Sequence, residues 1–270
     1  ARSARQEAPV PLRCVDGSLD LAMKHGAVPV EPALLLRSSG CHVPRLAHAA
    51  SISEAAGTAA WVGGSHLVTG GTGGLGLLTG RWLAQQGAGA VVLASRSGTL
   101  ASGTAAEWEL MQSTGAAVLV EVCDTAEVTH VRRLVSATGG RSRLSGVWHA
   151  AGVLVDGLLP KQSAQTLARV YAPKAHGAWA LELACVASPL RSWVLFSSVA
   201  ALLGGAGQAN YSAANSCLDA LAMCRRAQGD SATSIGWGPW AEVGMASGSA
   251  VNTRMRAMGL GLIEPWQGIA

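Results

Sequence analysis

Residues 66–76 read HLVTGGTGGLG, and this stretch decides the fold. The apolar run at 66–70 predicts a buried strand, and the small residues after it predict a tight turn into a helix. Glycine has no Cβ, so the backbone of such a turn can approach a pyrophosphate, and the helix N-terminus favours anions. A glycine-rich turn taken singly is often only a turn, but its place between a strand and a helix favours a dinucleotide site. The residues expected to form this site are Thr69, Gly70, Gly71, Thr72, Gly73, Gly74, Leu75 and Gly76.

The rest of the chain alternates short apolar runs with longer segments rich in Ala and Leu. Such alternation predicts parallel strands covered by helices on both faces, which is an α/β fold with a doubly wound, Rossmann-like parallel sheet. The strands are expected at 66–70, 90–95, 117–123, 146–151, 192–197 and 231–237. The helices are expected at 74–86, 104–114, 125–137, 165–186 and 209–228.

The first 60 residues follow a different pattern. Residues 31–36 and 41–46 read as two strands joined by a Ser-Ser-Gly turn, and 49–60 form a linker rich in Ala, Ser and Gly. We therefore expect a partial β-rich segment with its linker in 1–60 and one α/β domain in 61–270. The chain begins without methionine and ends on no terminating feature, so it reads as an excerpt of a longer polypeptide.

Composition argues against several classes of function. Charged residues make up only 13% of the chain, so the formal net charge of +4 reflects few acids rather than a basic track for nucleic acid. No apolar run reaches the roughly 18–20 residues that span a bilayer, and no signal peptide opens the chain. The six cysteines form no CxxC pair, and no His/Cys/Asp cluster has metal-ligand spacing. We expect a soluble protein of the cytoplasm or another reducing intracellular compartment, without a metal.

Polar residues after the second and third strands bear on the cofactor. Arg96 follows Ser95 at the end of the second strand, where an enzyme that uses NAD usually has an acid for the ribose hydroxyls. No Asp or Glu lies between Val91 and Ala106, which favours NADPH, because an arginine suits its 2′-phosphate. The alternative for Arg96 is a solvated surface residue. Asp124 either bonds the adenine amino group or caps the helix that follows it.

Tyr211 lies four residues before Asn215, 13 after Ser198 and 37 after Lys174. Reduction of a ketone needs hydrogen bonds to a developing alkoxide and an acid to protonate it, and a phenol and a serine hydroxyl supply both. Because a phenol has an ordinary pKa of about 10, we expect the Lys174 ammonium to favour its ionised form. In a helix over 209–228, Tyr211 and Asn215 share one face. Each residue alone is compatible with a surface or core role, but their joint spacing favours carbonyl reduction.

Five further motifs occur in the predicted domain, and they are HAAGVL at 149–154, APK at 172–174, FSS at 196–198, GGAGQANY at 204–211 and WGPW at 237–240. Together they resemble the ketoreductase domains of modular type I polyketide synthases, which belong to the short-chain dehydrogenase/reductase superfamily. The resemblance covers 61–270 almost continuously, and 31–47 is similar to the tail of the structural subdomain that precedes such a domain. Ordinary members of the superfamily have lysine four residues after the tyrosine. These domains have asparagine there, as at Asn215, and take the lysine from the preceding helix.

The resemblance implies a reaction and a set of roles. Tyr211 would be the proton donor, Ser198 would bind the substrate carbonyl, and Lys174 and Asn215 would complete a tetrad. NADPH would deliver hydride to a β-ketoacyl thioester on the phosphopantetheine of an acyl carrier protein, and other polyketide synthase domains would be further partners. The residues that the resemblance adds to the cofactor site are Ser95, Ala150, Ala151, Gly152, Trp237 and Gly238.

The resemblance also implies a stereochemical type, a lid and a set of substrate residues. Residues 154–156, Leu-Val-Asp, resemble the Leu-Asp-Asp signature of B-type ketoreductases and depart from it at Val155. Leu203 stands where A-type domains have tryptophan, so B-type stereochemistry is expected. Residues 240–255 would form a mobile lid, and the chain ends before the last strand of the family. The implied substrate residues are Asp156, Leu203, Gln208 and Met245.

Two other classes of function stay open. One is a stand-alone ketone reductase or a fatty acid synthase domain; Asn215 argues against the first and the motif at 237–240 against the second. The other is a non-catalytic Rossmann scaffold retained inside a megasynthase, against which the intact tyrosine and glycines argue. We expect His149 to hold the sheet behind the adenine rather than to act as an acid or a metal ligand.

Overall fold

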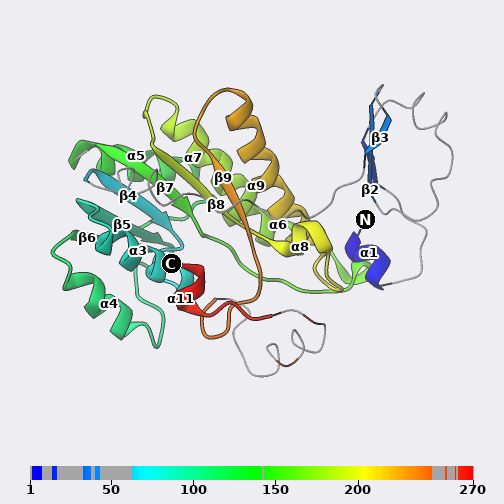
Figure 1. Ribbon diagram of the computed structural model, residues 1–270, viewed down its shortest axis with the longest axis horizontal. Helices are drawn as coiled ribbons and strands as arrows, with labels where there is room; N and C mark the ends of the chain where they lie inside the picture. Colours follow the sequence, from blue (N-terminus) through cyan, green and yellow to red (C-terminus); the bar gives the residue numbers. More distant parts are fainter. Residues whose placement is uncertain are drawn as a thin grey trace.

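The computed structural model describes residues 2–7, 14–16, 33–37, 40–42, 63–141, 143–244, 253, 259 and 261–269. Its centre is a six-stranded sheet with the order β6-β5-β4-β7-β8-β9, in which all neighbours run parallel (Figure 1). The strands are β4 (Ser65–Thr69), β5 (Ala90–Ser95), β6 (Ala117–Val122), β7 (Leu144–His149), β8 (Ser192–Ser198) and β9 (Thr233–Trp237). The strand order reverses between β4 and β7. Sheets of this kind bind ligands outside the C-terminal ends of the strands at such a reversal.

Helices cover both faces of this sheet, and two hydrophobic cores result. Neighbouring strand residues face opposite ways, so Leu67 of β4 belongs to one core and Val68 to the other. The first core packs against α5 (Val128–Arg141), α7 (Gly177–Cys185) and α9 (Ala209–Ala227). The second packs against α3 (Gly74–Gln85) and α4 (Ala105–Gln112). The doubly wound parallel sheet expected from the sequence is confirmed.

The segment predicted as a single helix over 165–186 is three consecutive elements. An α-helix, α6 (Ala164–Tyr171), runs into a π-helix, η4 (Ala172–His176), and then into α7. Pro173 explains the change, because proline has no N–H and its ring clashes with the carbonyl four residues earlier. The wider π-helical turn accommodates it. The prediction of one uninterrupted α-helix was therefore wrong at its centre.

Several short elements were not expected from the sequence, and they are α1 (Arg2–Glu7), β1 (Cys14–Asp16), η3 (Leu159–Lys161), α8 (Val199–Leu203) and α11 (Pro265–Gly268). In the N-terminal part, β2 (Ala33–Arg37) and β3 (Gly40–His42) pair antiparallel, as the strand–turn–strand pattern predicts. Residues 43–46 of the second predicted strand lie outside the described residues. The linker at 49–60 also lies outside them, so the domain boundary at 60 stays a prediction.

The described residues contain neither a candidate membrane-spanning helix nor a candidate metal cluster. None of the helices there combines the length and the apolar character needed to cross a membrane. Among the same residues, no three His, Cys, Asp or Glu side chains are grouped so as to hold a metal ion.

Candidate active site

The glycine-rich turn between β4 and α3 brings backbone to places where side chains do not fit. Gly70 has φ +67°, a left-handed conformation that glycine adopts without strain. A Cβ on Gly76 would lie 2.2 Å from the carbonyl oxygen of Gly70, and one on Gly71 would lie 2.6 Å from that of Val68. Gly73 differs, because a Cβ there would meet only the oxygen of Gly70 at 3.5 Å, an ordinary contact. The fold of the turn therefore requires three of these glycines but not Gly73.

The N-terminus of α3 has the chemistry of an anion site. Gly73 is its N-cap residue, and among the described residues no side chain caps the first amides of the helix. Such amides need an outside acceptor, and the helix dipole adds partial positive charge at the same point. The space beside Gly73 and the uncapped amides fit the pyrophosphate of a dinucleotide. The turn thus fits the cofactor that the sequence predicts.

Exchanging single glycines for alanine should separate binding from folding. Gly73 has φ −89° and ψ 170°, which alanine adopts freely, so Gly73→Ala should leave the melting temperature unchanged. Its methyl group would occupy the space for the pyrophosphate, and we expect cofactor affinity to fall about tenfold or more. The matched variant Gly76→Ala should lose about 3 kcal/mol of stability through the clash with Gly70.

Thermal melts and cofactor titrations of both variants check this pair. If Gly73→Ala binds the cofactor as tightly as the unsubstituted chain, the pyrophosphate does not lie beside Gly73. If Gly76→Ala melts at the unsubstituted temperature, the close approach to Gly70 is not a constraint on folding.

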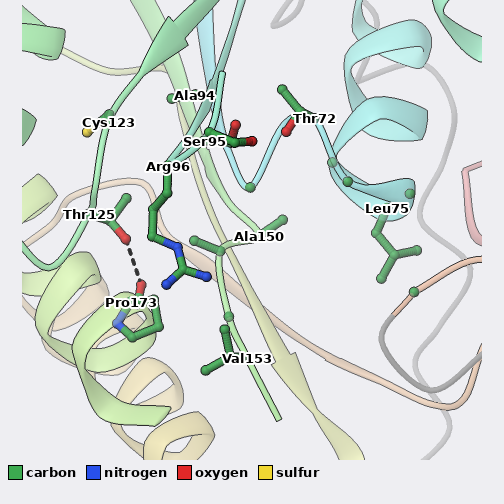
Figure 2. Close-up of a pocket in the computed structure, with 18 residues that line it drawn as sticks. Thr72, Leu75, Ala94, Ser95, Arg96, Cys123, Thr125, Ala150, Val153 and Pro173 are labelled. Atoms are coloured by element: carbon green, nitrogen blue, oxygen red, sulfur yellow. Dashed lines mark hydrogen bonds between the residues drawn. The ribbon is translucent and has the colours of Figure 1, made fainter. Parts of the chain in front are cut away.

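A cavity of about 460 Å³ lies beside this turn, at the C-terminal ends of β4, β5 and β7 (Figure 2). The predicted cofactor residues that line it are Gly70, Thr72, Gly73, Gly74, Leu75, Gly76, Ser95, Arg96, Ala150, Ala151 and Gly152. The predicted cofactor residues outside the lining are Thr69, Gly71, Asp124, Trp237 and Gly238. The lining residues that sequence reasoning missed are Ala94, Ser97, Cys123, Thr125, Val153, Pro173 and Gly244. Cys123 directly follows β6, and Ser97, Thr125 and Val153 lie two to four residues past the ends of β5, β6 and β7. Position just past the predicted strands was the signal that would have found these four.

Arg96 is exposed and lines the cavity at the end of β5. Figure 2 shows its side chain extending toward Ala150 and Pro173, with the guanidinium between them. No carboxylate among the described residues forms an ion pair with it. A guanidinium without an internal partner, at the rim of a cavity lined by helix amides, is placed to bind an anionic group.

Asp124 does not line the cavity. Its Oδ1 accepts a hydrogen bond from the N–H of Ala126 at 3.0 Å, and α5 begins only at Val128. The carboxylate therefore closes the turn between β6 and α5. This role resembles the helix-capping alternative for Asp124, but the bond lies just before the helix. Neighbouring Thr125 does reach the cavity, and its hydroxyl donates to the carbonyl of Pro173 at 3.0 Å (Figure 2).

His149, the last residue of β7, is fully buried and joins three elements. Its Nδ1 lies 2.7 Å from the Thr69 hydroxyl of β4, and its Nε2 lies 2.8 Å from the Lys174 carbonyl of η4. Burial lowers the pKa of His149 to about 4. A carbonyl can only accept, so the neutral ring donates from Nε2 and accepts the threonine proton at Nδ1. This residue fixes the π-helix to the sheet beside the cavity.

Lys174 is the central residue of η4 and is only 2% exposed. Its Nζ donates to the carbonyl of Phe196 in β8 at 2.8 Å and lies 5.5 Å from the centroid of the Tyr211 ring. Burial lowers the pKa of Lys174 to about 8, and the Asp219 carboxylate acts in the opposite direction. The π-helix thus brings an ammonium group with a pKa near neutrality to within reach of the predicted catalytic tyrosine.

Tyr211 and Asn215 lie one turn apart in α9, as predicted. The Nδ2 of Asn215 donates to the carbonyl of Tyr211 at 2.8 Å, and its buried Oδ1 has no partner among the residues the structure describes. Ser198 ends β8, and its hydroxyl accepts from the N–H of Ala200 at 3.2 Å. Burial raises the pKa of the Tyr211 phenol, whereas hydrogen bonding with Asn215 and Ser198 lowers it by less. Lys174 and Asn215 thus both contact Tyr211. None of the four predicted catalytic residues lines the cavity, although Lys174 directly follows Pro173, which does.

The remaining predicted residues are those of the substrate site, Asp156, Leu203, Gln208 and Met245. Gln208 Nε2 donates to Asp156 Oδ2 at 3.4 Å, and the carboxylate contributes to raising the pKa of Tyr211. Leu203 ends α8 with 45% of its surface exposed. Met245 and most of the predicted lid over 240–255 lie outside the described residues.

Trp237 ends β9, Gly238 follows it, and both lie in an apolar cluster. The Trp237 ring centroid lies 5.7 Å from that of Phe196 and 5.0 Å from that of Trp240. A Cβ on Gly238 would contact the Ile263 side chain at 3.4 Å. Their role beside a nicotinamide stays a prediction.

Comparison with known proteins adds three observations. The sequence model of the family described as "KR domain" matches residues 64–242. Polyketide synthase GfsB of Streptomyces halstedii is 42% identical over 236 residues, which are 87% of this chain and 4% of that protein. The chain therefore spans a small part of that relative's length. A solved structure titled "Structure of A-type Ketoreductases from Modular Polyketide Synthase" is 35% identical with TM-score 0.91, and covers 99% of this chain and 59% of that one.

Proposed function

Because this chain belongs to the ketoreductase domains of modular polyketide synthases, within the short-chain dehydrogenase/reductase superfamily, we propose that it reduces a β-ketoacyl thioester with NADPH. The product is the β-hydroxyacyl thioester. The observation that carries this proposal is that the buried Lys174 of η4 approaches the ring of Tyr211 in the first turn of α9, and that Ser198, at the end of β8, acts on the pKa of the same phenol. The cavity lined by the glycine-rich turn adjoins Lys174 through Pro173. When bound, the nicotinamide supplies the hydride.

Ser198 and Tyr211 act on the ketone oxygen of the substrate. Ser198 and Tyr211 donate hydrogen bonds to the ketone oxygen, and these bonds strengthen as negative charge develops on it. Because burial raises the pKa of Tyr211, the phenol stays protonated near neutral pH and is ready to act as an acid. Its O–H bond breaks as the proton passes to the alkoxide, which is a far stronger base than a phenolate. The result is an alcohol and a phenolate.

Lys174 and Asn215 support the phenolate. The ammonium near the Tyr211 ring offsets the negative charge left after proton donation, and with a pKa of about 8 it loses a proton readily near neutral pH. Asn215 holds the first turn of α9 through its bond to the carbonyl of Tyr211. Its buried Oδ1, which has no partner within the described part of the chain, offers an acceptor to a polar group in the site.

NADPH is the proposed cofactor because of Arg96. We expect Arg96→Ala to weaken NADPH about 10–100-fold and NADH by less than twofold, since a hydrogen bond to a charged group contributes about 1.5–3 kcal/mol. Arg132→Ala, which removes another exposed arginine, should change neither affinity. Titrations of both cofactors with both variants measure this. Equal losses for NADPH and NADH would mean that Arg96 does not bind the 2′-phosphate.

We further propose B-type stereochemistry. Asp156 keeps the last residue of the B-type signature and lies against Gln208, three residues before Tyr211. Leu203 stands where A-type domains have tryptophan. The solved relative titled A-type has the same fold, so fold similarity leaves this choice to these local residues. The thioester is proposed to arrive on the phosphopantetheine of an acyl carrier protein, with the other domains of a polyketide synthase as neighbours, because the relatives are long polyketide synthases.

The test is NADPH oxidation with a diffusible β-ketoacyl thioester, with the alcohol resolved by chiral chromatography. Turnover with one dominant alcohol of the B-type configuration supports the reaction and its stereochemistry. Turnover with the opposite alcohol refutes the B-type assignment alone. Tight NADPH binding without reduction of either the diffusible or the carrier-bound thioester refutes the catalytic proposal and favours a scaffold.

A further inference from the structure

The short N-terminal helix α1 packs against the segment that leads to the catalytic tyrosine, although the two are far apart in sequence. Figure 1 shows α1 beside α8, and Ser3 of α1 lies 3.2 Å from Ser212 of α9, hydroxyl to hydroxyl. Ser3 and Ala4 are buried there. The approach is close, because a Cβ on Gly204 would lie 2.9 Å from the Cβ of Arg2.

Side chains of α1 bind the end of α8. The last carbonyls of a helix lack partners within it. Arg2 Nη1 donates to the carbonyl of Ala201 at 3.3 Å, and Gln6 Nε2 donates to that of Leu203 at 3.2 Å. The Ser3 hydroxyl accepts from the N–H of the next loop residue, Gly205, at 3.3 Å. α1 therefore fixes the start of the loop from α8 to α9.

Glu7, the last residue of α1, bridges two separate segments. Its Oε1 accepts from the N–H of Gly207 at 2.8 Å, and its Oε2 accepts from the N–H of Leu159. Gly207 lies just before α9, and Leu159 opens η3. Hydrogen bonds from backbone N–H to a carboxylate are charge-assisted, and a negative charge near the N-terminus of α9 is favourable. One carboxylate therefore ties both segments to α1.

Hydrogen bonds also join these two segments to each other and to the catalytic tyrosine. The Gly157 N–H donates to the carbonyl of Gly207 at 2.8 Å, and Asn210 Nδ2 donates to the carbonyl of Val155 at 2.8 Å. The Oδ1 of Asn210 accepts from the N–H of Tyr211 at 2.7 Å. A continuous seam of hydrogen bonds thus has Glu7 at one end and Tyr211 at the other.

We propose that Glu7 is a positioning residue that sets the separation of the 155–159 and 207–211 segments and thereby the fit and facial orientation of the β-ketoacyl chain. It acts through the seam and touches neither substrate nor cofactor. The inference rests on the proposed function, since these segments carry Asp156, Gln208 and Tyr211. Nothing in the sequence pattern of residues 2–7 indicated such a contact.

The test compares Glu7→Ala and Glu7→Gln with the control Arg5→Ala, which removes an exposed side chain from the same helix. In Glu7→Ala we expect the KM of a diffusible β-ketoacyl thioester to rise about tenfold, as loss of about 1.4 kcal/mol of positioning energy gives. The ratio of the two alcohol stereoisomers should fall, while the Kd of NADPH stays within about twofold. Glu7→Gln keeps one acceptor oxygen, so its KM and stereoisomer ratio should lie between those of Glu7→Ala and the unsubstituted chain. Arg5→Ala should match the unsubstituted chain in both quantities.

Hydrogen exchange gives a second measurement that does not depend on turnover. Peptides covering 157–161 and 204–210 should exchange faster in Glu7→Ala, and those covering β4 and β5 should not. Unchanged KM, stereoisomer ratio and exchange in Glu7→Ala would overturn the inference, and so would faster exchange throughout the domain with weaker NADPH binding, which is a general loss of stability. If the unsubstituted chain binds NADPH but reduces no thioester, the proposed function fails, and unchanged exchange in Glu7→Ala or Glu7→Gln then overturns the role of Glu7 separately.

Discussion

Tyr211→Phe should lower turnover by about 10²–10³, because one hydrogen bond to developing charge is worth that much in rate. The substitution removes only the hydroxyl that donates the proton, and the ring still packs in the first turn of α9. The Kd of NADPH should therefore stay within about twofold, and the melting temperature within about 2 °C. Rates with a diffusible β-ketoacyl thioester, cofactor titration and thermal melting measure the three quantities.

The chain offers a matched control, because it contains only one other tyrosine. Tyr171 ends α6, and its ring packs edge-on against His176 with the ring centroids 6.2 Å apart. Tyr171→Phe should keep the full rate. Equal rates for Tyr211→Phe and the unsubstituted chain would remove Tyr211 as the proton donor, and equal losses in both phenylalanine variants would point to a general effect on the helices.

Lys174→Met should lower turnover by about 10² or more, because the acid and base apparatus of an active site typically contributes that much. Methionine has nearly the same length and no charge, so it fills the site without the ammonium group. The variant should also change how stability depends on pH. In the folded chain the pKa of Lys174 is about 8, against an ordinary 10.5, so the folded state gives up this proton more readily.

The sign of the pH effect follows from proton binding. Between pH 8 and 10.5 the unfolded chain binds more protons at Lys174 than the folded chain does, so stability rises with pH in this window. Relative to Lys174→Met, the unsubstituted chain should gain about 2 kcal/mol between pH 7 and about 9.5. Loss of the hydrogen bond to the Phe196 carbonyl is the same at both pH values and cancels. Urea unfolding of both proteins at the two pH values measures the difference.

A difference in unfolding free energy that does not vary with pH would mean that Lys174 keeps its ordinary pKa. Lys174→Arg is a second variant, since it retains a charge that does not titrate in this range. It should show no stability gain between these pH values. Loss of turnover with Met but not with Arg would assign the function of Lys174 to charge alone.

The sheet was predictable because strands such as β5 and β8 contain apolar runs, Ala90–Ala94 in the first and Trp193–Phe196 in the second. Glycines with positive φ, Gly87 and Gly229, also lie just past α3 and α9. The π-helix was not predictable, because Pro173 predicts an interruption of the α-helix but not its form, and the contacts of η4 with His149 and Phe196 join residues distant in sequence. α1 was missed for a related reason. It is six residues long, and its contacts are all with segments distant in sequence.

The parts of the site that are formed by residues close in sequence could be predicted from their spacing. The glycine turn is one case, and Tyr211 with Asn215, one helical turn apart, is another. Burial is a property of the whole fold, so the raised pKa of Tyr211 and the lowered pKa of Lys174 could not be read from the chain. The net direction is opposite to the expectation that Lys174 favours the ionised phenol, because burial raises the pKa of Tyr211.

The lining of the cavity has a practical consequence for mutagenesis. Nine of its 18 residues are glycine or alanine, so this wall is made largely of main chain. An alanine scan that tests only larger side chains would leave these nine positions, half of the lining, untested. Substitutions that add atoms, taken one position at a time, would outline the cavity instead. Natural variation should follow the same asymmetry, with replacements by larger residues being much rarer here than on the exposed faces of α4 and α5.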